Sequence, residues 1–177
     1  MTKKILVLSG SPRYGGNSDI LCDSFIAGAE KRGHITEKIY VNDMNIGTCQ
    51  ACYVCKKTGR CFIKDDMQEI LDKMINADVI VMATPVYFYS MDGQMKTLID
   101  RTLPKYTKIM NKDFYILLTA AAGKEAMERA VDGFRGFTDC LEGAVIKGII
   151  YGEGVYKKGE ILNTNKPKKA FTMGFNA

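Results

Sequence analysis

The sequence predicts a three-layer α/β fold built on a parallel sheet. Continuous apolar runs of strand length at 4–9, 78–84 and 114–119 are typical of strands buried on both faces. Each run leads through a loop into a segment whose apolar residues recur at helical spacing. Strands joined by such helices need right-handed crossovers, so we expect parallel strands with helices on both faces.

The strands and helices alternate along the chain. Asp66, followed by Glu69, has the pattern of a capping box that opens a helix. No helix is expected between the second strand and Asp66. The five predicted strands are 4–9, 35–41, 78–84, 114–119 and 145–151. Helices are predicted at 18–32, from Asp66 through Ile75, from Met95 through Thr102, after Gly123 to about Leu141, and at 168–174.

Length and composition are those of an ordinary globular domain. The chain has 177 residues, 46% hydrophobic and 25% charged, and we expect one domain over 1–177 with a cysteine-rich loop, 47–65, inserted after the second strand. No apolar run has the length of a membrane span, and no secretory signal is recognisable, so we expect a cytoplasmic protein without a membrane partner. The net charge is +5, but basic and acidic residues are interleaved, which argues against nucleic-acid binding.

The loop after the first strand, LSGSPRYGGNS at 8–18, has the composition of a phosphate site. Gly15 and Gly16 let a backbone approach a ligand closely, and the helix that follows offers free amides at its positive end. The ATP and dinucleotide fingerprints G-x-x-x-x-G-K-[ST] and G-x-G-x-x-G are both missing there, which favours a phosphate monoester. The polar side chains expected to contribute are Ser9, Ser11, Arg13, Asn17 and Ser18.

Four of the six cysteines lie in one window, CQACYVCKKTGRC, with the spacing C-x2-C-x2-C-x5-C. Closely spaced thiolates can converge on a [4Fe-4S] cluster, and Gly59 would allow the fourth to fold back. Free loop cysteines without metal, a zinc site and redox-active thiols remain open alternatives. These four residues are Cys49, Cys52, Cys55 and Cys61. The other two, Cys22 and Cys140, are expected to be small core residues.

Other candidate residues have weaker patterns. Tyr87, Phe88 and Tyr89 follow the third strand, and since adjacent side chains cannot all face one core, we expect a ligand or subunit contact. The single histidine, His34, precedes the second strand at the end opposite the ligand crevice and is expected in a surface turn, which removes support from hydrolase mechanisms. Two explanations account about equally well for the charges of Lys96 and Arg101: a solvated helix face and a role near a ligand.

Three segments together resemble the NADPH-dependent FMN reductase family, which has a flavodoxin-like fold, and its iron-sulfur flavoprotein branch. They are GSPR-YGGNS, ATPVYFYSMDGQMKTLIDR and the compact cysteine loop. The resemblance implies the strand order 2-1-3-4-5, FMN with its phosphate in the first loop, and a homodimer or homotetramer. It assigns FMN contacts to Ser9, Ser11, Arg13, Asn17 and Ser18 in the first loop, and to Pro85, Val86, Tyr87 and Phe88 along the flavin rim. Pro12 is a further candidate in the first loop, and Ser90 and Gly123 are further candidates for the rim.

The function predicted is therefore that of an FMN-dependent NAD(P)H oxidoreductase. Hydride would pass from the nicotinamide to the flavin and on to a small acceptor such as a quinone, free flavin or nitroaromatic. We expect no catalytic side chain, because the cofactor carries the chemistry. The alternative is an iron-sulfur flavoprotein that relays electrons from a ferredoxin-like protein through a [4Fe-4S] cluster to FMN. A third possibility is a module that binds FMN without turnover.

Overall fold

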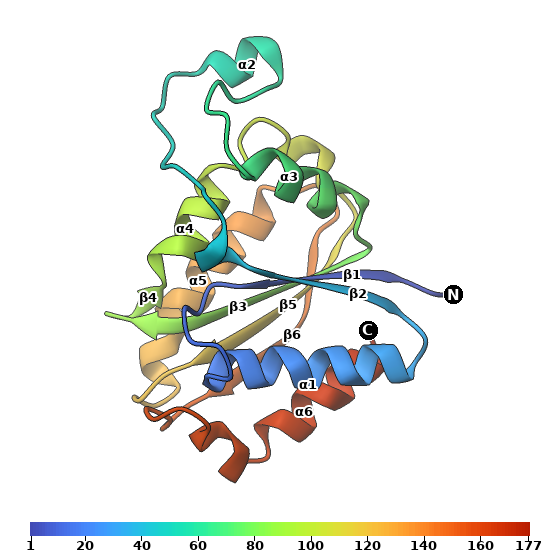
Figure 1. Ribbon diagram of the computed structural model, residues 1–177, viewed down its shortest axis with the longest axis vertical. Helices are drawn as coiled ribbons and strands as arrows, with labels where there is room; N and C mark the ends of the chain where they lie inside the picture. The colour runs from blue at the N-terminus through green and yellow to red at the C-terminus, as the bar shows by residue number, and fades with distance from the viewer.

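The computed structural model describes residues 1–177 and contains a parallel sheet in the order β2-β1-β3-β5-β6 (Figure 1). This order, renumbered for the parallel strands alone, is the predicted 2-1-3-4-5. A short sixth strand, β4 (Ser90–Met91), pairs antiparallel with the end of β3 and was not predicted. The parallel strands are β1 (Lys4–Ser9), β2 (Ile35–Tyr40), β3 (Val79–Tyr87), β5 (Asp113–Thr119) and β6 (Val145–Gly152).

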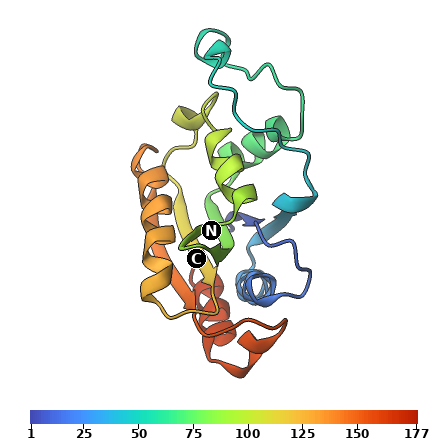
Figure 2. The ribbon, with the colours of Figure 1, turned by 90° about the vertical axis from the view of Figure 1, so that its left-hand side faces the viewer.

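Helices cover both faces of the sheet, as predicted. One face is covered by α1 and α6, and the other by α3, α4 and α5 (Figure 2). A short helix, α2 (Val54–Thr58), lies in the cysteine loop and projects from the body (Figure 1). The five longer helices are α1 (Asn17–Lys31), α3 (Met67–Asn76), α4 (Gly93–Asp100), α5 (Glu125–Asp139) and α6 (Lys166–Phe175).

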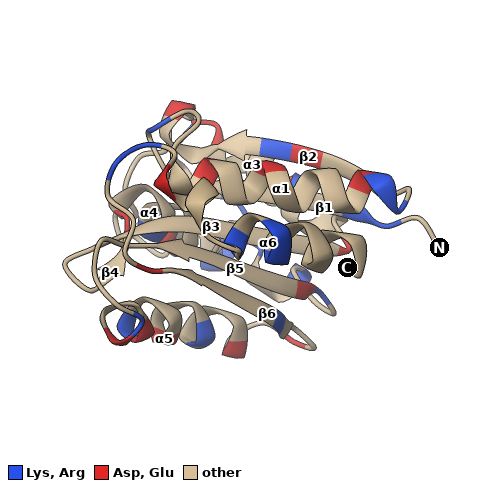
Figure 3. Ribbon diagram, turned by 90° about the horizontal axis from the view of Figure 1, so that it is seen from below, with Lys and Arg blue, Asp and Glu red and all other residues tan.

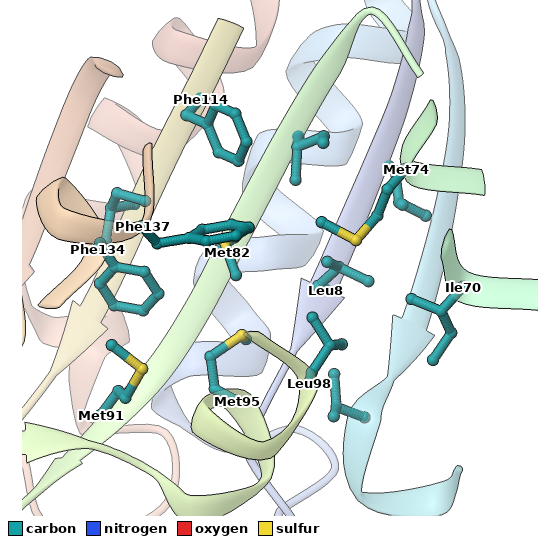
Figure 4. Packing of buried hydrophobic residues seen from close by; sticks show 14 of the residues in the cluster. Leu8, Ile70, Met74, Met82, Met91, Met95, Leu98, Phe114, Phe134 and Phe137 are labelled. Carbon is teal, nitrogen blue, oxygen red and sulfur yellow. The ribbon is translucent and has the colours of Figure 1, made fainter. Parts of the chain in front are cut away.

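Two apolar cores form, one on each side of the sheet, because the central strands are buried on both faces. In β5, six of seven residues are buried. The larger core has 25 buried residues, and Figure 4 shows how Met82 and Leu8 from the sheet meet side chains of the three helices on that face. The smaller core, between the sheet and α1 with α6, has 15. The double burial explains the continuous apolar runs in the sequence.

The crossing of α1 and α6 depends on two glycines. A Cβ atom at Gly28 would lie 2.0 Å from the carbonyl oxygen of Phe171, and one at Gly174 would lie 1.9 Å from that of Phe25. Any side chain at either position would push the helices apart. This contact fixes α6 against α1 and thereby fixes where the preceding segment, 153–165, crosses the edge of the sheet.

Three local predictions are wrong. The cysteine loop does contain a helix, since Gly59 N donates to Cys55 O at 2.8 Å to close a helical turn. Cys140 is exposed because it follows the last turn of α5, whereas Cys22 is completely buried as predicted. The Asp66 carboxylate accepts from Asn45 N at 2.7 Å instead of capping α3, so the capping box does not form.

Charged residues of both signs occur on α1 and α5, whereas α6 carries only basic ones (Figure 3). Acidic and basic residues are interleaved along α5, as the sequence predicts, whereas on α1 the acidic residues precede the basic residue at the end of the helix (Figure 3). None of the helices combines the length and the apolar character that crossing a bilayer requires.

Candidate functional site

Three loops meet at the carboxyl edge of the sheet because they leave neighbouring strands. Ser9 pairs with Ala83 across β1 and β3, and Pro85 pairs with Thr119 across β3 and β5. Since the chain runs from β1 outward to β2 and then back to β3, strand order reverses at this point. Such a reversal is where open α/β sheets bind ligands.

The first loop, residues 10–16, ends in a tight turn at the start of α1. Gly15 has a φ of +62°, and Gly16 N donates to Arg13 O at 2.9 Å. A Cβ atom on Gly16 would lie 2.8 Å from that same carbonyl oxygen, so only glycine fits. The turn is stabilised further by Arg13 N, which donates to the Ser11 hydroxyl at 3.2 Å.

The structure leaves donors free at this turn. The backbone amides of Asn17, Ser18 and Asp19 donate to no acceptor within the protein, because α1 begins there. Ser9 is completely buried below the loop, and its hydroxyl has no hydrogen-bond partner. Free amides at the positive end of a helix suit an anion. These groups fit the phosphate of a flavin mononucleotide.

A carboxylate lies beside this anion site and is neutralised. Asp19 is 2% exposed and accepts from Gly15 N at 2.6 Å, which holds the turn in place. Lys38 forms ion pairs with both Asp19 and Asp23. Burial alone would lower the pKa of Lys38, but the two carboxylates raise it, so Lys38 stays charged. The Asp19 charge is therefore compensated within the protein.

Two predicted phosphate ligands have other partners in the structure. The Asn17 side chain bonds to Lys157 O at 2.9 Å and to Ile161 N at 3.2 Å, far along the chain. The Ser18 hydroxyl pairs with the Thr119 hydroxyl at 2.7 Å. These two residues contribute backbone amides to the turn, while their side chains tie it to neighbouring segments. Arg13 and Pro12 are exposed at the rim, as a ligand contact requires.

The second loop is a hairpin with a strained two-residue turn. Phe88 and Tyr89 have φ values of +48° and +65°, a conformation that favours Asn-Gly over aromatic residues. Phe88 is fully exposed, and Tyr87 and Tyr89 are 48% and 56% exposed. Strained, exposed aromatic residues are typical of a binding surface. Of the other predicted rim residues, Pro85 and Val86 are half-buried at the end of β3, whereas Ser90 and Gly123 are exposed.

Asp92 joins this hairpin to the first loop and was missed in the sequence. It is 1% exposed, bonds to the Thr84 hydroxyl at 2.6 Å and accepts from Met95 N at 2.9 Å as the N-cap of α4. A Cβ on Gly10 would meet its carboxylate, so the first loop passes directly over it. Burial raises the pKa of the Asp92 carboxyl, against the opposing effect of these hydrogen bonds. The sequence did carry a signal for this residue, because an Asp directly before a helix is a preferred N-cap.

The cysteine loop is tied to the body by a buried ion pair. Arg101 and Asp65 form two N–O contacts, of 2.7 and 2.9 Å, with side chains 1% and 4% exposed. Asp65 also accepts from Gly47 N at 2.9 Å, and Arg101 donates to Gly47 O. The two ends of the loop therefore meet at one charged pair. Of the two explanations that the sequence left open, the solvated helix face does not apply to Arg101, whereas Lys96 is exposed and pairs with Asp100.

All four cysteines of the loop line one pocket beside Arg101 and Pro104. Their thiol chemistry suits an iron-sulfur cluster. The positions of the four cysteines in the structure do not suit a cluster, because no three metal-ligating side chains are grouped closely enough to hold an ion. Gly59, with a φ of +69°, adopts the left-handed conformation that ends α2 ahead of the fourth cysteine. His34 lies at the opposite end of the sheet, where it contacts Lys3 N and Ala177 O.

The strand order and the anion site at its reversal define the class of flavodoxin-like proteins. Comparison with known proteins identifies the family within that class. The model of the NADPH-dependent FMN reductase family matches residues 3–155, and the chain belongs to this family.

Relatives with iron-sulfur and with reductase names are both similar to this chain. An iron-sulfur flavoprotein of Archaeoglobus fulgidus is 32% identical over 97% of the chain and 77% of its own length. Iron-sulfur flavoprotein MJ1083 of Methanocaldococcus jannaschii is 41% identical over 57% of the chain, a match that spans only 52% of that relative. The NAD(P)H-dependent FMN-containing oxidoreductase YwqN of Bacillus subtilis is 26% identical over 94% of the chain and 93% of its own length.

Solved structures of low sequence identity share the fold. An NAD(P)H:quinone oxidoreductase from Methanothermobacter marburgensis superposes with a TM-score of 0.78 at 15% identity, covering 99% of this chain and 97% of that one. An azoreductase from Bacillus anthracis superposes with a TM-score of 0.79 at 18% identity, covering all of both chains. These matches confirm the flavodoxin-like architecture.

Proposed function

We propose that the protein is an FMN-dependent NAD(P)H oxidoreductase that reduces a small acceptor such as a quinone, free flavin or nitroaromatic. The observation that carries this proposal is the turn at Gly15 and Gly16 with its free amides at the strand-order reversal. Membership of the NADPH-dependent FMN reductase family supports it. The bound flavin would supply hydride and electron transfer, which no side chain of the site provides.

The roles of the protein groups follow from their positions. The amides at the start of α1 would bind the phosphate, and Arg13 would add a cation at the exposed rim. The hairpin residues Tyr87 and Phe88 would lie along the flat ring system, and Pro85 would border it. Asp92 holds the hairpin and the first loop together through Thr84, so it positions both halves of the site.

Binding and turnover can be measured separately. Titration of the purified protein with FMN, followed by flavin fluorescence, should show one site per chain. Arg13→Ala should weaken FMN binding about tenfold, as expected for loss of one charge-assisted contact. Arg32→Ala, at the far end of α1, is the control and should bind FMN normally. Failure of the wild-type protein to bind FMN would refute the proposal.

Steady-state oxidation of NADH or NADPH with a quinone acceptor tests the enzymatic part. We expect flavin-dependent oxidation with at least one of the two nucleotides. Stoichiometric FMN binding without any turnover would instead identify a flavin-binding module. The assay therefore separates an oxidoreductase from a sensor.

A second candidate function is electron relay through the cysteine loop to FMN from a ferredoxin-like protein. It is favoured by the four cysteines, which all line one pocket, and by the iron-sulfur names of several relatives. Cys49, Cys52, Cys55 and Cys61 would hold the cluster after the loop closes. Anaerobic purification followed by iron and acid-labile sulfide assays tests this candidate. Iron and sulfide near four per chain would support it, and their absence from anaerobically reconstituted protein would refute it.

We propose further that the protein works in the cytoplasm as a homodimer or homotetramer. A thiol-rich loop of this type needs a reducing compartment. The exposed, strained hairpin at Phe88 offers an aromatic surface of the kind found at subunit interfaces. Light scattering after gel filtration should give a dimeric or tetrameric mass, and Phe88→Ser should shift it toward the monomer. A monomeric wild-type protein would refute the assembly.

A further inference from the structure

The segment after β6, residues 155–163, crosses the sheet edge and packs against the first loop. We call it the strap. Val155 and Ile161 anchor it in the smaller core, with 5% and 0% exposure. The Asn17 side chain fastens it at the start of α1, donating to Lys157 O at 2.9 Å and accepting from Ile161 N at 3.2 Å. The strap is therefore fixed relative to the anion site.

Within the strap, the turn that carries Lys158 is rigidly held. The Glu160 carboxylate accepts from Tyr156 N at 2.7 Å and from Lys157 N at 2.9 Å. Gly159 adopts a φ of +86°, which the turn requires. Because both ends of the turn are held, the position of the Lys158 backbone is set by the fold.

This turn brings the Lys158 ammonium to the first loop. Its Cε and Nζ atoms lie 3.1 and 3.3 Å from the place that a Cβ on Gly15 would occupy. Arg13 reaches the same turn, donating to Tyr156 O at 3.4 Å. Lys158 takes part in no ion pair, and Asp19, the buried carboxylate at Gly15, is already neutralised by Lys38. The Lys158 ammonium is thus an exposed positive charge without an ion-pair partner, and it lies at the Gly15 turn that leads into the free amides of α1.

We infer that Lys158 binds the phosphate group of the flavin mononucleotide and selects FMN over riboflavin. Asn17 is a positioning residue that acts through the strap. This inference rests on the proposed function and extends it to a residue outside 3–155, the part of the chain that the family model matches. An ammonium beside free helix amides stabilises a dianionic phosphate, whereas a neutral ribityl hydroxyl gains little from it.

The test compares FMN and riboflavin binding by fluorescence titration. Lys158→Gln should weaken FMN binding about tenfold, leave riboflavin binding unchanged and reduce the salt dependence of FMN affinity. Lys169→Gln, an exposed lysine on α6, is the matched control and should bind both ligands as the wild type does. FMN affinity within twofold of the wild type in Lys158→Gln would overturn the inference, as would an equal loss of riboflavin binding.

A second variant tests the role of the strap. Asn17→Ala removes both bonds to the strap and should weaken FMN binding, with little further loss when it is combined with Lys158→Gln. Fully additive losses would show that Asn17 does not act through Lys158. A wild-type protein that binds neither flavin would refute the proposed function itself. Wild-type FMN binding that Lys158→Gln leaves unchanged would refute only the present inference.

Discussion

Neutralising Asp65 tests whether the cysteine loop is held by the buried ion pair with Arg101. Both N–O contacts are short, 2.7 and 2.9 Å, and the side chains are 1% and 4% exposed, so Asp65→Asn leaves a buried guanidinium without its counter-charge. Breaking such a pair costs about 3–5 kcal/mol. Because the amide of Asn can keep one hydrogen bond, we expect a loss of about 3 kcal/mol, the lower end of that range.

The assay is equilibrium urea denaturation at neutral pH, followed by circular dichroism. With an m value of about 2 kcal/mol per molar urea, the midpoint should fall by roughly 1.5 M. Asp100→Asn is the matched control, because Asp100 is the neighbour of Arg101 and pairs with Lys96 in an exposed 2.6 Å contact. It should cost less than about 1 kcal/mol. Equal midpoints for the two variants would refute the reasoning.

The same pair predicts a pH dependence. Burial alone would raise the pKa of Asp65, but Arg101 and the amides of Gly47 and Met67 outweigh it and lower the pKa. Since the folded-state pKa lies below the unfolded value of about 4, the stability from this pair is present above that pH and is lost as pH falls below it. The wild type and Asp65→Asn should therefore converge in stability under acid conditions. A difference that persists unchanged at low pH would contradict this assignment.

Three further predictions concern packing, reactivity and strain. Gly28→Ala should destabilise the protein by about 1–3 kcal/mol or more in thermal denaturation, because its Cβ would lie 2.0 Å from a carbonyl oxygen. The control Gly136→Ala, where the Cβ would meet open space, should stabilise the protein by about 0.5–1 kcal/mol. Burial raises the pKa of the Cys22 thiol to about 12, so iodoacetamide at pH 8 should leave it unmodified in the native protein by mass spectrometry; rapid labelling would contradict its burial. The double substitution Phe88→Asn and Tyr89→Gly should raise stability by about 1 kcal/mol while weakening FMN binding. Unchanged FMN affinity would show that the hairpin does not contact the flavin.

Local signals in the sequence were sufficient to predict the main strands and helices, because each signal depends on a short stretch of residues. The apolar run of β5 and the glycine turn before α1 each depend on neighbours a few residues away. The strand order, in contrast, came from the resemblance to a family and is confirmed by the structure. Strand β4 escaped prediction because it has two residues and a turn built from Phe88 and Tyr89, which do not carry the usual turn signal.

For the candidate site, the structure shows which predicted residues are exposed and which have partners within the protein. Arg13 and Phe88 are exposed at the rim, in line with the predicted ligand contacts. Arg101 has the sequence context of a solvated helix face, yet it is buried against Asp65, which lies 36 residues away. Asn17 has the pattern of a phosphate ligand, yet its side chain is occupied by the strap, 140 residues further on.

By itself, the sequence determined the alternation of buried strands and helices, the glycine turn and the spacing of the four cysteines, since each is a property of contiguous residues. Only the tertiary structure decided which side chains are free for a ligand. How α6 packs on α1 and carries the preceding segment across the sheet decides whether the Asn17 side chain is free for a phosphate or bonded to the strap. It also decides whether the exposed Lys158 side chain reaches Gly15. Such contacts between residues distant in sequence form only when the chain folds and the two hydrophobic cores assemble.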